Sequence, residues 1–241
     1  MASSLIELII ALFLVYAIVP TAIIRFSNIG NLSRARKGLG RVVLTFDDGP
    51  DPRYTPRVLE ILDQYQVKAC FFVVGAKAKA NPDLIKQIAL AGHEIGSHGF
   101  RHQAAWLTGP RATATENMET SRVIEEITGQ KPRFYRPPWG LFNLYSLWFF
   151  WSKGLKVALW TYFSWDWTKR ATPESITRKV LSKIQDGDIL ILHDSGSGPG
   201  AAPGGPANML AALPRILEEL KNRNLRVVPL KEVAVKKSGT G

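Results

Sequence analysis

The sequence predicts an α/β protein with a parallel sheet, preceded by one apolar helix. Strand-like runs alternate with helix-like stretches along most of the 241 residues, and such alternation favours a parallel sheet. Polar residues able to carry chemistry follow the ends of several strand-like runs, which is where closed α/β barrels place their sites. With 46% hydrophobic residues the chain can bury one sizeable core, and its length favours one domain over two.

Seven runs have the composition of strands. They cover residues 42–46, 69–74, 94–97, 133–135, 157–160, 189–192 and 226–230. Helix-like stretches lie between them at residues 56–65, 82–91, 112–128, 173–184 and 209–222. We therefore expect one folded domain over residues 41–235.

The N-terminal segment suits a membrane better than a core. Residues 8–24 carry no charge, and about twenty residues at the rise of an α-helix cross a ~30 Å hydrocarbon layer. No basic region precedes the segment, and no cleavage site of small residues is evident. We predict a transmembrane anchor at residues 5–24, with a buried hairpin helix as the alternative. A linker at residues 25–40 and a basic tail at residues 236–241 complete the predicted organisation.

Basic residues set the expected orientation and partners. Arg25, Arg34, Arg36, Lys37 and Arg41 follow the apolar segment, and the positive-inside rule keeps such a cluster in the cytoplasm. The whole chain carries a net charge of +11, which points to an anionic partner. Anionic lipid headgroups or an acidic wall polymer fit an anchored protein, and no nucleic-acid motif competes with them.

Three further features do not by themselves name a chemistry. Cys70 is the only cysteine and lies in an apolar run, so we expect a buried thiol and no intrachain disulfide. Residues 195–206 form a Gly- and Pro-rich loop directly after a strand, either a connector or a mobile substrate rim. Residues 141–151 are unusually aromatic, which fits a barrel helix packing its apolar face or a membrane-docking surface.

Two segments suggest a metal site. The motif at residues 45–50, Thr-Phe-Asp-Asp-Gly-Pro, ends a strand in two adjacent carboxylates, which repel each other unless a cation lies beside them. His98 and His102 are four positions apart. On a single helical turn both imidazoles would lie on one side, where they could share an ion with a carboxylate. We expect His93, nearby, to be structural and to cap a helix end.

Three more segments supply polar groups at strand ends. Arg136 is followed by two prolines, then by Trp139 and a glycine that allows close approach of the backbone to a ligand. Asp166 lies between two tryptophans, and the apolar run at 189–192 ends in His193. Each segment alone has a structural explanation, but five in this order do not.

Together these segments resemble the NodB-homology polysaccharide deacetylases, the family four carbohydrate esterases, from about Arg41 to Val235. The first segment is the family's TFDDGP unchanged, and the second is its H-(S/T)-x-x-H apart from Gly99. The third is its RPP-aromatic-G with Trp139 at the usual tyrosine, and the last is its L-x-H-D with Ile191 for leucine. The resemblance implies an irregular (β/α) barrel with about seven parallel strands.

The resemblance also implies roles for the site residues. Asp48, His98 and His102 would bind one divalent metal ion, and Asp47 would be the general base that takes a proton from the metal-bound water. Arg136 would pair with Asp47. His193 would be the general acid for the amine leaving group, because the nearby carboxylate of Asp166 favours its protonated form.

Substrate contacts are implied as well. Trp167 and Ile191 would line the acyl pocket, Pro137 would contact substrate, and the backbone amide of Trp139 would share the oxyanion. Zinc is the first choice of metal on ligand type, but cobalt, nickel, manganese or iron suit the same ligands.

The predicted function is the metal-dependent removal of N-linked acetyl groups from amino-sugar units of a polysaccharide such as peptidoglycan. One alternative is a deacylase or deformylase of a membrane lipid-linked amino sugar. Another is a catalytically silent member that only binds glycan. Family members that modify peptidoglycan act outside the cell, whereas the charge pattern places the domain inside, so the side of the membrane stays open, as does the oligomeric state.

Overall fold

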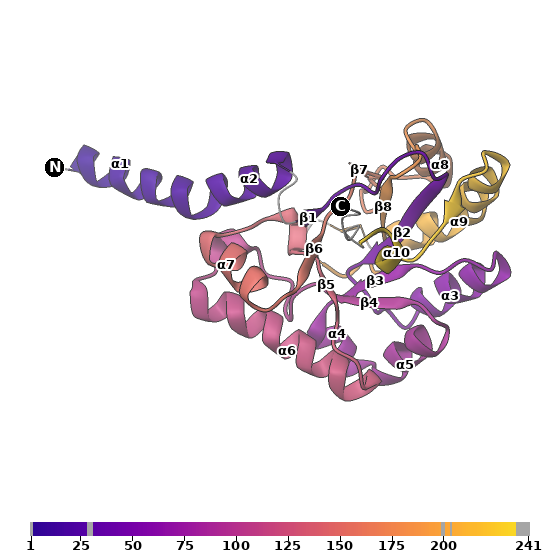
Figure 1. Ribbon diagram of the computed structural model, residues 1–241, viewed down its shortest axis with the longest axis horizontal. Coiled ribbons are helices and arrows are strands. Elements are labelled where there is room, and N and C mark those ends of the chain that lie inside the picture. Colours follow the sequence, from indigo (N-terminus) through magenta and orange to yellow (C-terminus); the bar gives the residue numbers. More distant parts are fainter. Residues whose placement is uncertain (1, 28–30, 199–200, 203, 235–241) are drawn as a thin grey trace, which may run out of the picture.

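The structure is a computed structural model that describes residues 2–27, 31–198, 201–202 and 204–234. A curled sheet with helices packed around it forms the domain, and one long helix projects from it (Figure 1). The predicted basic tail at 236–241 lies outside the described residues.

The sheet contains only parallel strand pairs among the described residues. Its strands are β1 (Asn31–Leu32), β2 (Arg41–Asp47), β3 (Cys70–Val73), β4 (Glu94–Ser97), β5 (Phe134–Tyr135), β6 (Lys156–Ala158), β7 (Tyr162–Phe163), β8 (Ile189–His193) and β9 (Arg226–Val227). The order is β1-β6-β5-β4-β3-β2-β8-β7, with β9 paired to β2. The predicted α/β class and curled parallel barrel are confirmed. The seven predicted strands correspond to β2–β6, β8 and β9, whereas β1 and β7 are too short to be recognised by composition.

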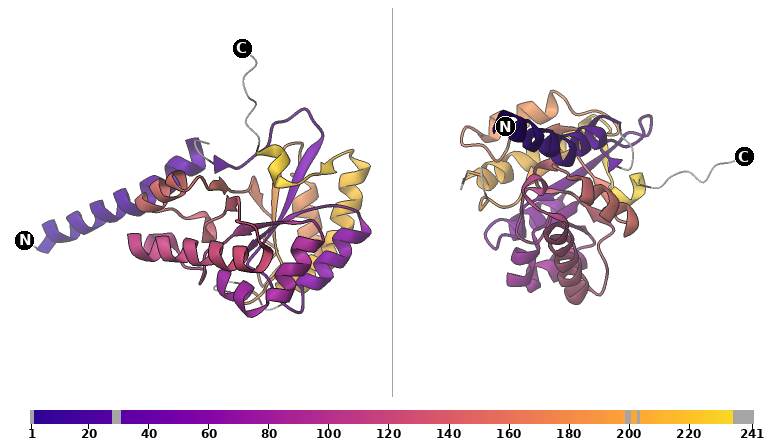
Figure 2. Two further views of the ribbon diagram at one scale, coloured as in Figure 1. Left: turned by 60° about the horizontal axis from the view of Figure 1, so that its bottom comes forward. Right: turned by 90° about the vertical axis from the view of Figure 1, so that its left-hand side faces the viewer.

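The helices lie around the sheet (Figure 2). They are α3 (Thr55–Gln64), α4 (Gly75–Ala80), α5 (Pro82–Leu90), α6 (Pro110–Thr128), α7 (Leu144–Ser152), α8 (Pro173–Leu181), α9 (Gly205–Asn222) and α10 (Leu230–Val233), with short 3-10 turns η2 (Ala105–Leu107) and η3 (Pro138–Gly140). All five predicted helices are present, as α3, α5, α6, α8 and α9.

Alternation along β2 positions the site. Leu44 and Phe46 belong to the main core with residues of α3 and α9, whereas Val43 belongs to a second core cluster with Cys70. Successive side chains of a strand point to opposite faces, so Asp47 shares the face of Val43, away from the helices of the main core. Cys70 is buried, as predicted.

The N-terminal segment is one long helix. It consists of α1 (Ala2–Phe13), a π-helical turn η1 (Leu14–Ile18) and α2 (Val19–Ser27), and residues Ser4–Ser27 are long and apolar enough to cross a membrane. Its second half is not free. The Tyr16 hydroxyl donates to the carbonyl oxygen of Thr108 (2.9 Å), and the Thr21 hydroxyl oxygen accepts from Trp106 Nε1 (2.9 Å). The helix therefore docks on the domain that it leads into.

The prediction of a linker at residues 25–40 is wrong for much of the described part. Residues 25–27 continue the helix, and β1 pairs with β6 through Asn31 and Val157. Arg34 then forms a 2.9 Å salt bridge with the buried carboxylate of Asp188, at the start of β8. The segment therefore joins the β6 and β8 sides of the sheet. Composition alone does not predict a two-residue strand whose pairing partner, Val157, lies more than a hundred residues away.

Candidate active site

The chemically suited side chains meet at the carboxyl ends of the central strands. Asp47 ends β2 and lies in register with His193 at the end of β8. His98 follows β4, and Arg136 follows β5. Because neighbouring parallel strands end at the same edge of a sheet, segments far apart in the sequence are brought together here.

Asp48, His98 and His102 form a set that could hold a metal ion. One ligand atom from each lies within 4.8 Å of the others. Asp48 Oδ1 is 3.3 Å from His98 Nε2 and 3.0 Å from His102 Nε2. His98 Nδ1 lies 2.7 Å from the carbonyl oxygen of Arg136, and since a carbonyl can only accept, Nδ1 carries the proton.

That hydrogen bond makes a cation a good fit. In a neutral imidazole protonated at Nδ1, Nε2 has only a lone pair to offer. The Nε2 atom of His98 would then face the carboxylate of Asp48 with two acceptors in contact, which is unfavourable unless a cation lies between them. Two imidazoles and one carboxylate, with one imidazole oriented by a carbonyl, are the donor set of catalytic zinc and related sites.

Arg136 is fully buried and holds Asp47. Its Nη1 donates to Asp47 Oδ1 (2.6 Å) and to the hydroxyl of Thr45 (2.8 Å). Its Nε and Nη2 donate to the carbonyl oxygens of Ala158 (3.0 Å) and Leu159 (2.8 Å). The expected pair of Arg136 and Asp47 is present, and these hydrogen bonds fix the direction of the Asp47 carboxylate.

The loop between the two histidines differs from the prediction. Residues 98–102 are not a helical turn, because Gly99 and His102 both have positive φ (78° and 56°). The buried Glu116 of α6 holds this loop: its carboxylate accepts from the backbone amides of Phe100 (2.8 Å) and Arg101 (2.7 Å). Glu116 therefore orders a loop in which Gly99 offers no hydroxyl. No local signal identified it, because α6 begins only after the loop.

His193 and Asp166 form a second polar pair. His193 Nδ1 donates to Asp166 Oδ1 (3.0 Å), and the backbone amide of His193 donates to Asp166 Oδ2 (2.7 Å). Burial lowers the pKa of His193, but the charge and hydrogen bond of Asp166, with the charges of Asp48 and Asp47, outweigh it and raise the pKa to about 9. His193 therefore carries a proton at neutral pH.

Aromatic rings border both groups. The Trp139 ring lies edge-on to the His102 ring, with centroids 4.4 Å apart, and the Trp167 ring lies edge-on to the His193 ring at 4.9 Å. Trp139 is partly exposed, whereas Pro137 and Ile191 are buried. Ile191 lies two residues before His193 on β8 and therefore shares its face of the strand.

Strained backbone gathers at this site. Six described residues other than glycine have positive φ, and four of them lie here: Asp48, His102, Trp139 and Trp165. Such conformations are costly for residues with a Cβ and persist where the surrounding structure enforces them, often at functional sites. The strain is an independent indication that this edge of the sheet was selected for more than packing.

Sequence reasoning assigned no role to Lys77 or Asp194. Lys77 Nζ donates to the backbone carbonyl of Asp48 (2.7 Å) and to the hydroxyl of Ser195 (2.8 Å). Asp194 accepts from the hydroxyl of Thr55 (2.6 Å), and its burial raises its pKa to about 7. Lys77 thus ties Asp48 to the start of the predicted 195–206 loop. That loop borders the site, since a Cβ on Gly198 would lie 3.9 Å from Asp48 Oδ2.

Arg25 reaches the rim of the site from the N-terminal helix. Its guanidinium lies over the rings of Trp160 (5.0 Å to the centroid) and Phe163 (5.5 Å). A Cβ built on Gly140, next to Trp139, would lie 3.2 Å from Arg25 Nη1. The end of the apolar helix is therefore part of the surroundings of the site.

His93 has the structural role expected of it, with a different partner. Its Nδ1 accepts from the backbone amide of Ala69 (3.2 Å), just before β3, rather than capping a helix. Burial and the charge of Lys68 lower its pKa to about 4, so the imidazole stays neutral and can accept this bond.

Comparison with known proteins identifies the family. Residues 35–158 match the polysaccharide deacetylase family model. A peptidoglycan-N-acetylglucosamine deacetylase of Bacillus cereus is 35% identical over 197 residues, covering 80% of this chain and 87% of that protein. A chitooligosaccharide deacetylase of Sinorhizobium fredii is 33% identical over 199 residues, covering 79% and 90%.

Solved structures agree with this match. The crystal structure of a peptidoglycan N-acetylglucosamine deacetylase bound to a substituted N-oxidanyl-benzamide superposes with a TM-score of 0.81 and 27% identity, covering 88% of this chain and 95% of that one. A Bacillus anthracis protein described as a family 4 pseudoenzyme has a TM-score of 0.75 and 28% identity, covering 83% and 67%. Fold, motif residues and relatives agree, and the chain belongs to the polysaccharide deacetylase family.

Proposed function

We propose that this protein is a metal-dependent hydrolase that removes N-linked acetyl groups from amino-sugar units of a glycan such as peptidoglycan. One observation carries the proposal: a candidate cation site, an arginine-held carboxylate and a histidine hydrogen-bonded to a second carboxylate meet at one edge of the sheet. Amide hydrolysis needs these three functions, an activated water, a base and an acid for the amine.

The proposed division of labour follows the contacts. Asp48, His98 and His102 hold a divalent cation, zinc first by ligand type, which when bound polarises the acyl oxygen and acidifies a water. Asp47, aimed by Arg136, accepts the proton of the attacking water. His193, protonated beside Asp166, donates a proton to the departing amine.

Substrate contacts complete the proposal. The backbone amide of Trp139 donates to the developing oxyanion, and Trp167, Ile191 and Pro137 bound the acyl group. The partial exposure of Trp139 beside His102 suits a residue that meets substrate.

Acetate release tests the proposal. The full chain in detergent should release acetate from N-acetylated oligosaccharides, lose this activity with a chelator and regain it with zinc or another divalent metal. The candidate metals can be compared in the same assay. A well-metallated protein that binds glycan but releases no acyl group from any amino sugar would support the silent, glycan-binding alternative and overturn the enzyme.

A second candidate function is deacylation or deformylation of a membrane lipid-linked amino sugar. The observation that favours it is the position of Arg25, which lies in the last turn of the apolar helix and beside the site. A lipid-linked sugar is anionic at its phosphate, close to the membrane. An arginine at the end of a membrane-spanning helix could bind the phosphate while the sugar reaches the cation site.

Arg25→Gln separates the two functions. If the substrate is lipid-linked, the variant should lose turnover on that substrate, whereas turnover on short soluble oligosaccharides should change little. A chain beginning at Tyr16 retains the docked half of the helix and β1 but not the anchor, and should show the same selective loss. Protease shielding of the domain in intact cells would exclude action on mature wall.

A further inference from the structure

The short helix α7 is apolar on both of its sides. Phe149 and Phe150 are buried in a core cluster. On the opposite side Leu144, Trp148 and Trp151 lie four and three residues apart, and they are 53%, 59% and 88% exposed. A helix that is apolar all round needs an apolar medium on each side. The protein supplies only one of them.

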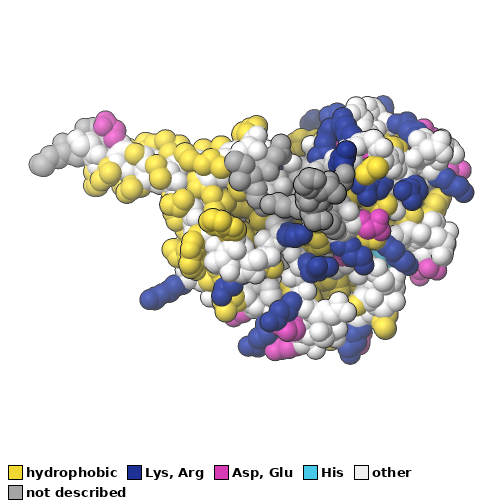
Figure 3. Space-filling view, viewed as in Figure 1, with side chains coloured by type: hydrophobic (Ala, Val, Ile, Leu, Met, Phe, Trp, Pro, Cys, Tyr) yellow, Lys and Arg dark blue, Asp and Glu magenta, His cyan; other side chains and the backbone are white. Residues whose placement is uncertain are grey.

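This exposed face adjoins the N-terminal helix. Phe142, two residues before α7, donates its backbone amide to the hydroxyl of Thr21 (2.9 Å). The adjacent turn η2 exposes 85% of Leu107. In Figure 3 the hydrophobic side chains along the N-terminal helix continue onto the adjoining part of the domain, while Lys and Arg gather on the rest of this view. The apolar surface thus continues from the helix onto the domain.

The length of the free part of the helix shows how deep this surface lies. Contact with the domain begins at Phe13, whose ring lies 6.0 Å from that of Trp106. Within the apolar span Ser4–Ser27, only residues 4–12 precede this contact. They rise about 14 Å, less than half of a ~30 Å hydrocarbon layer. If the helix crosses the membrane, its docked half must lie within the bilayer too. The elements packed on that half, η2 and α7, must then enter the same side of the bilayer.

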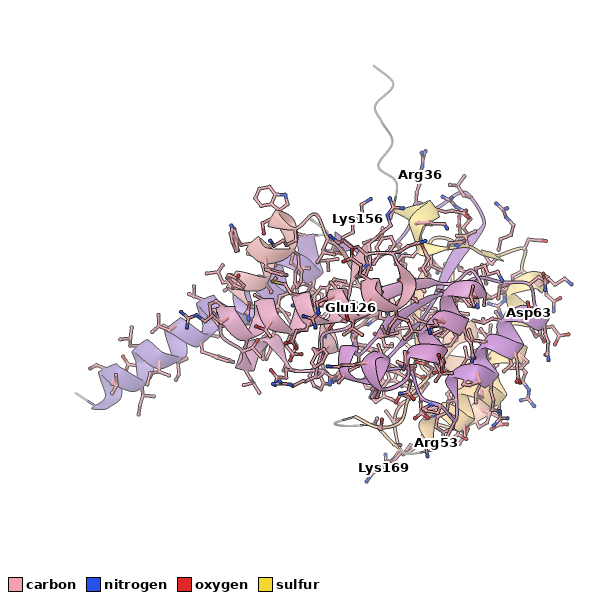
Figure 4. The ribbon with its side chains drawn as sticks, turned by 90° about the horizontal axis from the view of Figure 1, so that it is seen from below. Arg36, Arg53, Asp63, Glu126, Lys156 and Lys169 are labelled. Atoms are coloured by element: carbon pink, nitrogen blue, oxygen red, sulfur yellow. The ribbon has the colours of Figure 1, made fainter. Side chains whose placement is uncertain are left out.

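The side chains of α7 suit that depth. Tryptophan prefers the interface between hydrocarbon and headgroups. Lys153 directly follows α7 and is exposed, so its ammonium could meet anionic headgroups. Arg53, Asp63 and Lys169, labelled in Figure 4, lie on the body of the domain away from the N-terminal helix.

We propose that Leu144, Trp148 and Trp151 of α7, with Leu107, lie in the interfacial layer of the membrane that Ser4–Ser27 crosses. The inference rests on the predicted membrane anchor at residues 5–24 and adds the position of the domain relative to it. The domain lies against the bilayer in one orientation instead of moving on a flexible tether. Because Arg25 and Trp160 join the docked helix to the site, the distance of the site from the membrane surface is fixed as well.

Spin labels on the full chain test the proposal. In a Cys70→Ala background, single cysteines replace Ile9 in α1, Trp151 in α7 or Leu90 at the end of α5. Leu90 is the matched control, since it is a large apolar side chain as exposed as Trp151 (87% against 88%) and lies on a distant helix (Figure 1). The chain is placed in phosphatidylethanolamine–phosphatidylglycerol vesicles, and collisions with oxygen and with a water-soluble nickel chelate are measured.

The expected ratio of oxygen to nickel collisions is several-fold higher at Ile9 and Trp151 than at Leu90. A water-like ratio at Trp151 with a lipid-like ratio at Ile9 would overturn the α7 contact and leave the anchor standing. Water-like ratios at both would overturn the anchor as well. A label at Leu144 gives a second reading of the same face, so that disturbance at one position cannot decide the result.

Discussion

The two sides of the site are built differently. On the cation side, Arg136 is completely buried and makes four hydrogen bonds, one of them to Asp47. On the acid side, His193 is partly buried, and Asp166 is its one side-chain hydrogen-bond partner among the described residues. The pKa of His193 is raised to about 9. The first side holds charges in place, whereas the second holds a proton that can leave.

The two sides of the site should therefore respond differently to substitution. On the cation side, the charged groups hold one another in place. A substitution there should alter cation binding or the direction of the Asp47 carboxylate. On the acid side, a substitution in the pair of His193 and Asp166 should alter the pH range over which His193 is protonated.

The largest effect is expected from the cation ligands. Asp48→Ala and His102→Ala should lose bound metal and activity together, because each removes one of three ligands. Asp47→Asn should keep the metal and lose about 10² to 10⁴ in turnover, because the amide cannot accept a proton. Metal content and acetate release of the same preparations check both. Equal metal loss in the two aspartate variants would refute the division between ligand and base.

A similar loss without any loss of metal is expected on the acid side. His193→Ala should reduce turnover about 10² to 10⁴-fold, because the imidazolium proposed to protonate the departing amine is removed. Metal content should remain at the level of the unaltered protein. For a substrate with a less basic leaving amine, His193→Ala should cause a smaller loss of turnover. The role would be wrong if substrates with good and poor leaving groups suffered equally.

The pH profile should move when Asp166 is neutralised. His193 acts as an acid only while protonated, so turnover falls as pH rises through its pKa, which lies at about 9 without a cation. A bound divalent cation repels the imidazolium and moves this limb lower. In Asp166→Asn the carboxylate that raises the pKa is gone, so the limb should move lower still. Turnover measured between pH 6 and 10 decides it, and an unchanged limb would exclude His193 as the titrating group.

The smallest effect is expected from Glu116, which acts through the loop. Glu116→Gln keeps one acceptor but loses the charge that holds the amides of Phe100 and Arg101. We expect about 10-fold weaker metal affinity, the lower end for groups that support ligands, with turnover at saturating metal nearly unchanged. Glu119→Gln is the matched control, because Glu119 is exposed on the same helix. Identical affinities in the two variants would remove the role of Glu116.

Much of the fold and site could be predicted from sequence because the signals are local. The composition of an apolar run such as 189–192 is enough to predict a strand. The polar residue that follows the run, His193, then lies at the edge of the sheet where the strand ends. The chemistry of Asp47 and Asp48 is readable for the same reason. Two supporting contacts were missed because the partners are remote in sequence: Glu116 of α6 accepts from the amide of Phe100, and Lys77 of α4 donates to the backbone carbonyl of Asp48.

The N-terminal region shows the limit most clearly. By itself the sequence determined that residues 5–24 are apolar and helical, because composition fixes the affinity of a segment for water. Only the tertiary structure decided that the helix docks through Tyr16 and Thr21, and that residues 31–35 close the sheet. Docking and closure depend on complementary groups that lie more than eighty residues away in the sequence. Local composition does not show which distant groups a segment will contact.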